Sequence, residues 1–493
     1  MNTIDLSKKN EFLKLRLVKD QNITQKKELE NCFKKFSKKN FIIEENGKEI
    51  TYKDFFINSL KLVYYLKKKG LEKNSKILIL SDNCLNYLIT LTACLLGGFI
   101  VCPIDPTMKT ERLEELKKIL KFDFIIKNAN KLIFKNCPVD PDLINYRNED
   151  FLIICSSGTT GDPKGILFSS DAFLKSSKSF SNLTKYSEQT KILHCLPMFY
   201  MAGILNTFFS CMFAGSKIVL GKKFSVSSIL NFWNLPKKFD CNFLHLTPSI
   251  YASICAVFKK NSKLNEHTKK YKSIISTGSF LYPEIQEKFY KIFNKRIFSC
   301  YGVTEIGGPL TIQSSKDVSL NFCVGTHSPE VKININKDPN GDKKVFIKSP
   351  FLIKGYLTKA GLEIPKTKDG YYDTGDIGDY KNNLLFINGR KKDFIKRGGE
   401  LISLSLIENT ALQNDSILEA AAIGKKDVLV GEELYLIITI NGKFSLNEKI
   451  NEIRSFLSNK LRPIEMPKKI TIIPEMPKTG SGKIKKDSLI KII

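Results

Sequence analysis

The chain lacks the cysteine spacing and the leader that would mark a secreted or zinc-binding protein. Its twelve cysteines include no C-x-x-C pair, and several, such as Cys94 and Cys102, sit inside apolar runs. This distribution predicts buried free thiols in a reducing compartment. The first ten residues, M-N-T-I-D-L-S-K-K-N, contain no apolar core. We therefore expect no secretory leader and a cytoplasmic location.

Uncharged stretches are also scarce. The longest, Asn83–Ile104, has the length of a membrane span, but Asn86 and Pro103 interrupt its apolar pattern. The run therefore predicts a buried helix followed by a short strand over Phe99–Cys102. We expect no integral membrane segment.

Acidic residues are too few to balance the basic ones. There are 78 Lys and Arg against 50 Asp and Glu, which leaves a net charge of +28. A nucleic-acid or anionic-membrane partner would suit this charge, and so would a general compositional bias towards Lys, Ile, Asn and Phe. The lysines are spread along the whole chain, and clustering rather than total charge marks a nucleic-acid-binding face. We expect no nucleic-acid partner, whereas an acidic protein partner stays open.

The length and the order of elements predict a layered α/β protein. A chain of 493 residues is too long for one core, so two or more domains are expected. Apolar runs at Lys76–Leu80 and Phe124–Ile126 predict strands, and Thr110–Lys121 predicts a helix between them. Such alternation is typical of a mostly parallel sheet covered by helices.

A glycine-rich loop, Cys155–Gly165, reads C-S-S-G-T-T-G-D-P-K-G and lies between two apolar runs that predict strands. Glycines let the backbone approach a ligand closely, and successive N–H groups in such a turn can hold an anion. The loop is not the common G-x-x-x-x-G-K-[ST] phosphate loop, because its lysine follows a proline. The groups that could hold a polyphosphate are Ser156, Ser157, Gly158, Thr159, Thr160, Gly161 and Lys164. On glycines alone, an ordinary polar hairpin turn would remain an alternative.

Three predicted strands end in small or polar residues. Ligands of open α/β sheets bind at the carboxyl ends of the strands, so these ends predict a site. The three strands are Asn242–His245, followed by Thr247-Pro248-Ser249; Ser273–Ser276, followed by Thr277-Gly278-Ser279; and Ile297–Cys300, followed by Tyr301-Gly302-Val303-Thr304-Glu305. Alone, Glu305 would be interpreted as a solvated carboxylate.

Taken together, these segments resemble the adenylate-forming superfamily, which includes acyl-CoA synthetases, luciferases and the adenylation domains of peptide synthetases. The motifs occur in family order over roughly residues 50–490. They are the glycine-rich loop, Leu196–Gly203, Tyr301–Glu305, Tyr371–Asp376 (Y-Y-D-T-G-D), Asn388–Asp393 (N-G-R-K-K-D) and Pro477–Lys483 (P-K-T-G-S-G-K).

The resemblance implies an α/β fold in two domains. Residues 1–391 would form a large domain of layered β-sheets with helices and a small β-barrel-like part. Residues 392–493 would form a small, mobile α+β domain that carries the catalytic lysine. Lys392 occupies the family's hinge position, where other members have Asp or Lys.

The resemblance also implies a site for ATP and Mg²⁺. Tyr301 would pack on adenine beside Gly278 and Gly302, and Asp376 would accept hydrogen bonds from both ribose hydroxyls. The remaining assignments are Arg390 on ribose and phosphate, Lys164 and the loop hydroxyls on the β- and γ-phosphates, Thr304 in the phosphate region, and Glu305 on Mg²⁺.

Two half-reactions follow from the resemblance. A carboxylate oxygen attacks the α-phosphorus of ATP, giving an acyl-adenylate and pyrophosphate, and a thiol then displaces AMP. Lys483 would neutralise charge during the first step. The small domain would then rotate about Lys392, bringing the loop of Lys396, Gly398 and Gly399 to the thiol side of the site.

The acid and the thiol are less constrained. Tyr200 stands where CoA ligases often have His, and it would line the acid pocket with Thr277 and Gly278. We expect an acyl-CoA synthetase for a fatty or aryl acid, with CoA as acceptor and a role in fatty acid metabolism. An acidic carrier protein that bears a phosphopantetheine thiol is the alternative acceptor. Residues 202–207 contain no Asp, which argues against an α-amino acid. A non-catalytic basic scaffold is the third hypothesis, and it predicts degenerate motifs.

Overall fold

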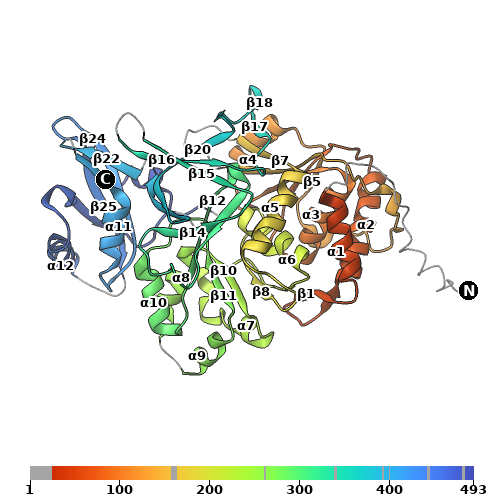
Figure 1. The fold of residues 1–493 in the computed structure, drawn as a ribbon, viewed down its shortest axis with the longest axis horizontal. Coiled ribbons are helices and arrows are strands. Elements are labelled where there is room, and N and C mark those ends of the chain that lie inside the picture. The colour runs from red at the N-terminus through yellow and green to blue at the C-terminus, as the bar shows by residue number, and fades with distance from the viewer. Residues whose placement is uncertain are drawn as a thin grey trace, which may run out of the picture.

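A computed structural model describes most of the chain. The described residues are 25–156, 164–259, 262–337, 341–390, 393–398, 400–440, 445–479 and 484–493. In Figure 1 the N-terminal elements lie on the right and the C-terminal elements on the left. Three sheets and the helices that cover them account for the architecture.

The first sheet has seven strands in the order β18-β17-β7-β6-β4-β3-β5. Strands β3, β4, β5 and β6 pair in parallel, whereas β7, β17 and β18 extend the sheet in antiparallel fashion. The strands are β3 Lys76–Leu80, β4 Ile100–Ile104, β5 Phe124–Ile126, β6 Asp150–Ser156, β7 Lys164–Ser169, β17 Gly355–Thr358 and β18 Gly361–Glu363. The glycine-rich loop therefore joins two antiparallel neighbours, β6 and β7.

The second sheet has fourteen strands, and the direction of strand pairing differs between its two halves. One half is parallel and runs β12-β11-β10-β8-β9-β1, with β2 antiparallel at its edge. Its strands are β1 Asn40–Glu44, β2 Glu49–Thr51, β8 Lys191–His194, β9 Lys217–Leu220, β10 Phe243–Leu246, β11 Ser273–Ser276 and β12 Phe298–Val303. The other half is antiparallel and consists of β13 Gly308–Ile312, β14 Cys323–His327, β15 Lys332–Lys337, β16 Lys343–Lys348, β19 Thr367–Lys368, β20 Tyr371–Lys381 and β21 Leu384–Arg390.

Helices cover both faces of the parallel half. One face packs against a core shared with the first sheet, and the other packs under its own helices. The helices are α1 Gln25–Lys35, α2 Tyr52–Lys68, α3 Leu85–Gly97, α4 Thr110–Leu120, α5 Ser170–Leu183, α6 Ser210–Ala214, α7 Asn234–Lys238, α8 Pro248–Val257, α9 Ser262–Lys269 and α10 Pro283–Phe293. Shorter helical segments are η3 Ala129–Lys131, η4 Pro141–Leu143, the π-helix η5 Ala202–Phe209, η6 Val226–Asn231 and η7 Thr304–Ile306.

The third sheet consists only of residues that follow Asp393. Its strands are ordered β23-β22-β25-β24, with β26 paired to β25. They are β22 Phe394–Arg397, β23 Glu400–Ser403, β24 Ile417–Asp427, β25 Gly431–Ile440 and β26 Lys469–Ile472, accompanied by α11 Leu404–Leu412, α12 Leu446–Ser458, η9 Pro463–Glu465 and α13 Lys486–Leu489. Its core is separate from those of the other sheets.

These features confirm the expected α/β class, with a large sheet-rich N-terminal part and a smaller C-terminal part. Strands β3, β4 and β5 pair in parallel, as their alternation with helices predicts. The large sheet is mixed, because the chain beyond β12 continues as antiparallel hairpins. Helix α5 is capped by Ser169, whose hydroxyl accepts from the N–H of Ala172.

The long uncharged run forms the expected buried helix, α3, followed by β4. Helix α3 ends at Gly98, whose φ of 74° is a left-handed value that suits glycine. Within the described part of the chain, none of the helices combines the length and hydropathy that a membrane span requires. All twelve cysteines are free thiols.

Candidate active site

Tyr301, Asp376 and Arg390 form one hydrogen-bonded group, although they come from three strands. The hydroxyl of Tyr301 on β12 donates to Oδ2 of Asp376 at 2.5 Å. Arg390 Nε donates to Oδ1 at 3.0 Å, and its position on β21 pairs with Asp376 on β20 in register. Burial raises the pKa of Asp376, and the charge of Arg390 partly offsets this shift. The group combines an aromatic ring, a buried carboxylate and a cation.

A second group forms around Tyr356 on β17. The ammonium Nζ of Lys164 lies 3.9 Å from the centroid of the Tyr356 ring. The Tyr356 hydroxyl donates to Oε1 of Glu305 at 3.4 Å and lies 3.0 Å from the hydroxyl of Tyr372. Strand β17 can bring this ring to Lys164 because it pairs with β7, with Tyr356 opposite Ile166. Tyr356 therefore links the end of the glycine-rich loop to Glu305.

The two groups belong to one site because they share elements. Tyr372 and Asp376 both lie on β20, and Tyr301 and Glu305 lie at the end of β12 and in the helix η7 that follows it. Thr304 begins η7 and is half-buried. Gly302 is required between them, because a Cβ at this position would lie 1.9 Å from the carbonyl oxygen of Gly308.

The predicted strand ends at Thr277 and Gly278 also meet. Thr277 N donates to the carbonyl of Leu246, so the ends of β10 and β11 lie side by side. Gly278 has a φ of 95°, and Thr247 Cγ2 lies 3.6 Å from the position that a Cβ would take there. The positive φ explains why glycine occupies this position at the mouth of the sheet.

Tyr200 lies just before the π-helix η5. Its carbonyl accepts from the N–H groups of Gly203 and Ile204 at 3.1 Å, and its ring lies 4.8 Å from Phe199. Helix η5 packs towards the β12–β13 hairpin, because Leu205 Cδ1 lies 3.7 Å from where a Cβ on Gly308 would be. The helix is therefore next to β13, which pairs with the strand that carries Tyr301.

The middle of η5 contributes to a buried polar group that sequence reasoning missed. Asn206 Nδ2 lies 3.3 Å from His245 Nε2, and His194 Nδ1 lies 2.5 Å from the hydroxyl of Thr207. Burial lowers the pKa of each histidine to about 3. Among the described residues, His245 Nδ1, His194 Nε2 and Asn206 Oδ1 have no hydrogen-bond partner.

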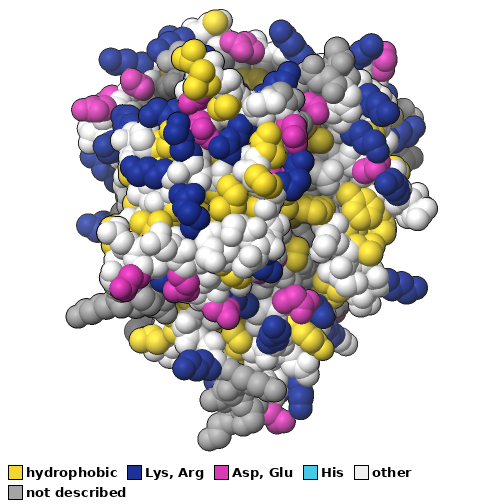
Figure 2. All heavy atoms as spheres, turned by 90° about the vertical axis from the view of Figure 1, so that its left-hand side faces the viewer, with side chains coloured by type: hydrophobic (Ala, Val, Ile, Leu, Met, Phe, Trp, Pro, Cys, Tyr) yellow, Lys and Arg dark blue, Asp and Glu magenta, His cyan; other side chains and the backbone are white. Residues whose placement is uncertain are grey.

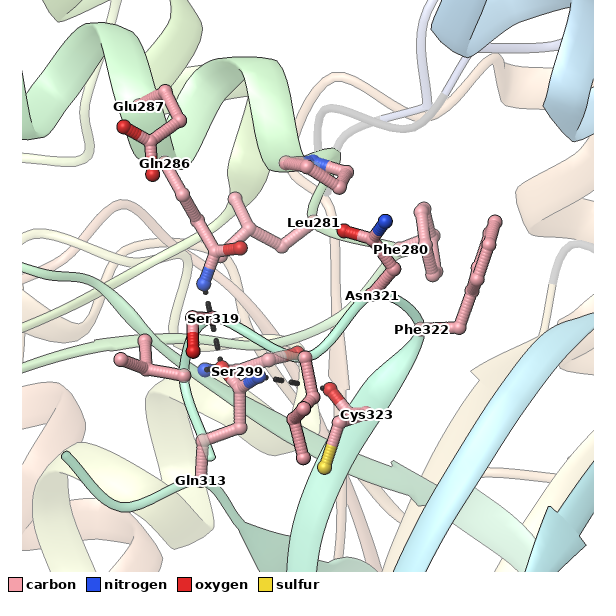
Figure 3. A pocket seen from close by; sticks show the side chains of 13 residues that line it. Phe280, Leu281, Gln286, Glu287, Ser299, Gln313, Ser319, Asn321, Phe322 and Cys323 are labelled. Carbon is pink, nitrogen blue, oxygen red and sulfur yellow. Dashed lines mark hydrogen bonds between the residues drawn. The ribbon is translucent and has the colours of Figure 1, made fainter. Parts of the chain in front are cut away.

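A pocket of about 120 Å³ opens beside the strand of Tyr301 (Figure 3). The amide of Gln313 organises its floor, accepting from the Ser299 N–H at 2.7 Å and donating to the Cys323 carbonyl at 2.9 Å. At its rim the rings of Phe280 and Phe322 stack with centroids 5.7 Å apart. The pocket therefore adjoins the segment that follows Gly278, through Phe280 and Leu281.

The thiol-side residues make contacts within the third sheet. Lys396 N donates to Glu432, and Gly398 N donates to the carbonyl of Val430 at 2.8 Å. Both residues are exposed. Arg397 between them bonds to the carbonyls of Ile464 and Met466 at 2.7 Å. This loop is therefore held by its own sheet in the present arrangement.

Several predicted residues lie outside the described part of the chain. They are Ser157, Gly158, Thr159, Thr160 and Gly161 of the glycine-rich loop, Lys392 at the expected hinge, Gly399, and Lys483; for Ser156 only the backbone is described. The backbone that enters and leaves the loop is described, with Ser156 paired to Lys164 across β6 and β7. Their roles stay predictions.

Comparison with known families agrees with this geometry. The model of the AMP-binding enzyme family matches residues 29–143 and 141–357, and that of the AMP-binding enzyme C-terminal domain matches residues 406–483. The chain belongs to the AMP-binding enzyme family. The first match includes Lys164, Tyr301, Glu305 and Tyr356 of the site, and the second includes β24, β25 and β26 of the third sheet; Tyr372, Asp376 and Arg390 lie between the two matches.

Individual relatives are distant but cover most of the chain. A mitochondrial malonate–CoA ligase from Homo sapiens is 23% identical over 91% of this chain and 89% of its own length. An oxalate–CoA ligase from Arabidopsis thaliana is 27% identical over 70% of this chain and 68% of its own. The o-succinylbenzoate coenzyme A synthetase from Bacillus subtilis, solved with ATP and a magnesium ion, superimposes with a TM-score of 0.79 at 20% identity, covering 94% of this chain and 99% of that one. The last comparison concerns the fold alone.

Proposed function

We propose that this AMP-binding enzyme is an ATP-dependent, AMP-forming acid–CoA ligase. The observation that carries the proposal is the meeting of Lys164 and Glu305 on Tyr356. A cation at the end of a glycine-rich loop and a carboxylate facing the same ring are the two charges needed to hold a metal–polyphosphate. Relatives named as CoA ligases support the choice of thiol.

The proposed roles use the two residue groups separately. Tyr301, beside Gly278 and Gly302, offers an aromatic face to adenine, and Asp376 accepts from the ribose hydroxyls with Arg390 beside it. Lys164 and the loop N–H groups hold the outer phosphates, with Thr304 next to them. A Mg²⁺ ion on Glu305 would neutralise phosphate charge as pyrophosphate leaves.

Neither half-reaction needs a protein nucleophile, so positioning and electrostatics do the catalysis. The substrate carboxylate attacks the α-phosphorus and pyrophosphate departs, while Lys483 offsets the developing charge. The CoA thiolate then attacks the acyl carbon, and the carbonyl–oxygen bond to AMP breaks. We keep residues 1–391 and 392–493 as the proposed domains, with Lys392 as hinge and the Lys396–Gly399 loop on the thiol side.

The proposal also concerns the chemical class of the acid substrate. Fatty or aryl acids are the prediction from sequence, with Tyr200, Thr277 and Gly278 as the pocket. The unpaired atoms of His245 and Asn206 lie at the middle of η5, the helix that follows Tyr200. Buried polar groups without partners are costly, so a pocket that reaches them favours an acid with a second polar group. Relatives named for malonate and oxalate are consistent with this extension.

The deciding experiment is pyrophosphate release from purified protein with Mg-ATP across a panel of fatty, aryl and short dicarboxylic acids, with CoA and with a carrier protein as acceptors. The proposal expects release with at least one acid, and AMP and an acyl-CoA once CoA is present. Appearance of ADP and phosphate would refute it. Thioester on the carrier protein alone would favour the alternative acceptor.

The basic-scaffold hypothesis receives no support from the face shown in Figure 2, where Lys and Arg side chains are interspersed with acidic and apolar ones. Intact Tyr301, Asp376 and Glu305 contacts are also unlike the degenerate site that this hypothesis predicts.

A further inference from the structure

A partly buried hydrogen bond joins the C-terminal part to the rest of the protein. The hydroxyl of Tyr282, which immediately precedes α10, donates to Oε2 of Glu408 on α11 at 2.5 Å. Glu408 is only 5% exposed. Weaker contacts join α10 to the residues just after α11, from Gln413 Nε2 to Glu284 at 3.0 Å and from Lys288 to Asp415 at 3.2 Å.

Both carboxylate oxygens of Glu408 have hydrogen-bond or ion-pair partners. Its Oε1 accepts from the backbone N–H of Ala422 at 2.8 Å and lies 2.7 Å from the ammonium of Lys486. Lys486 is the first residue of α13 and also lies 4.0 Å from Asp393. One buried carboxylate thus joins three segments: the start of α10, strand β24 and the segment before the C-terminus.

The ring of Tyr282 is also connected to the proposed nucleotide site, through aromatic contacts. Its ring lies 5.1 Å from that of Phe280, which in turn stacks on Phe322 at the rim of the pocket in Figure 3. Phe280 is two residues after Gly278. The contact with Glu408 therefore starts from the same short segment that lies at the ends of β10 and β11.

Lys486 lies close in the sequence to the proposed catalytic lysine. It follows Lys483 by three residues, and three residues of extended chain span at most about 11 Å. The segment between them is anchored, because Ile484 pairs with Lys478 and Lys485 N donates to the carbonyl of Pro477 at 2.7 Å. Holding Lys486 beside Tyr282 restricts where Lys483 can reach.

We propose that Tyr282, Glu408 and Lys486 form an interdomain lock that positions the Lys483 segment for adenylate formation and must open before thiol transfer. The inference rests on the proposed two-step function. In the arrangement described, Lys486 lies near Tyr282, while Lys396 and Gly398 are exposed and bonded within their own sheet. Rotation of the C-terminal part would separate Tyr282 from Glu408, since they belong to different proposed domains.

The lock sets the balance between two populations rather than the chemistry of either step. Adenylation proceeds from the locked arrangement and thiol transfer from the open one, so the ratio of their rates follows the ratio of populations. A hydrogen bond to a buried charged group contributes enough to change such a ratio by about 10-fold or more. The three residues are positioning residues, because they need not touch the substrates.

The test is Tyr282→Phe, which keeps the ring beside Phe280 and removes only the donor. Adenylation is followed by pyrophosphate release, and transfer by CoA thioester formed from supplied acyl-adenylate. The ratio of transfer to adenylation should rise about 10-fold, with the change in kcat rather than in KM for ATP. If the rates of adenylation and of transfer in Tyr282→Phe both stay the same, or both fall by the same factor, the proposed lock is wrong.

Lys288→Met is the matched control at the same interface. It removes only the exposed pair with Asp415, whose carboxylate is 94% exposed, so the ratio should change less than about twofold. A shift as large as that of Tyr282→Phe would assign the effect to the interface in general and contradict the role of Tyr282.

Hydrogen exchange tests the lock without any substrate. Tyr282→Phe should speed amide exchange in α11 and at Ala422 relative to the wild type and to Lys288→Met. If no acid in the panel releases pyrophosphate, the proposed function fails while this readout still reports on the lock. Unchanged exchange would refute the lock even in an active enzyme.

Discussion

The ammonium of Lys164 stands over the ring of Tyr356, 3.9 Å from its centroid, while the hydroxyl of the same tyrosine reaches Glu305. One side chain therefore contacts both groups to which we assign the outer phosphates and the metal. Tyr356 comes from β17, which lies far along the chain from the glycine-rich loop and joins it only through pairing with β7.

This relationship predicts separable effects of two substitutions at Tyr356. Tyr356→Phe keeps the ring under Lys164 and loses the hydroxyl, so KM for ATP should change little. Tyr356→Leu also loses the cation–π contact, which contributes about 0.5–2 kcal/mol, so KM should rise about 2- to 30-fold. Steady-state kinetics of pyrophosphate release measures both. Equal effects of Phe and Leu would show that the ring does not position Lys164.

Glu305→Gln should raise the Mg²⁺ concentration needed for half-maximal adenylation and slow the reaction strongly. The substitution keeps the size and an oxygen for Tyr356 but removes the charge that a hard cation requires. The control is Glu363→Gln on the neighbouring exposed strand β18, which should behave as wild type. A Mg²⁺ titration that is the same for all three proteins would return Glu305 to the role of a solvated carboxylate.

The buried histidines predict a loss of stability in acid. Burial lowers the pKa of His245 and of His194 to about 3, whereas the unfolded chain titrates near the ordinary value of about 6.5. Their stabilising contribution is complete above about pH 6.5 and is lost as the pH falls towards 3. Each histidine contributes a slope of about 1.4 kcal/mol per pH unit in this window.

Urea unfolding of wild type and His245→Gln between pH 7 and 4.5 measures this slope. As the pH falls, the free energy of unfolding of His245→Gln should decrease less steeply than that of the wild type, by about 1.4 kcal/mol per pH unit. For the His194→Gln/His245→Gln double variant the difference in slope should be about twice as large. Parallel curves for all three proteins would mean that these histidines are protonated in the folded state.

The two lysines of the C-terminal part should fail in different half-reactions. Lys483→Ala should slow adenylation by about 10²–10³ and spare thioester formation from supplied acyl-adenylate. Lys392→Pro should do the opposite, because proline fixes φ near roughly −65° and prevents rotation at the hinge. Thermal melts control for folding. Equal loss of both half-reactions in folded variants would exclude the two-arrangement mechanism.

Much of the site could be predicted because it depends on short local patterns. The apolar runs at 243–246 and 273–276 form strands, and the residues after them line the same sheet edge. The pairing of Tyr301 with Asp376 and Arg390 agrees with the three motifs that contain them. Two glycines also stand where the backbone requires glycine: Gly278 has a positive φ, and there is no room for a Cβ at Gly302.

The rest depends on pairings that sequence spacing does not encode. Tyr356 lies in a stretch without a distinctive pattern and reaches the site only because β17 adds to the edge of β7. His245 stands among apolar residues in a strand that is buried throughout, so its unpaired nitrogen is recognised only once Asn206 is placed beside it. Tyr282 and Glu408 meet through the packing of two parts of the chain, which no local signal reports.

The most direct test of the account follows the substrate oxygen. With the acid identified by the panel labelled with ¹⁸O in both carboxylate oxygens, the reaction is run with Mg-ATP and CoA, and AMP is analysed by mass spectrometry. Attack of the carboxylate on the α-phosphorus and later cleavage of the carbonyl–oxygen bond must leave one labelled oxygen in each AMP. AMP without label, or label in inorganic phosphate beside ADP, would contradict adenylate formation.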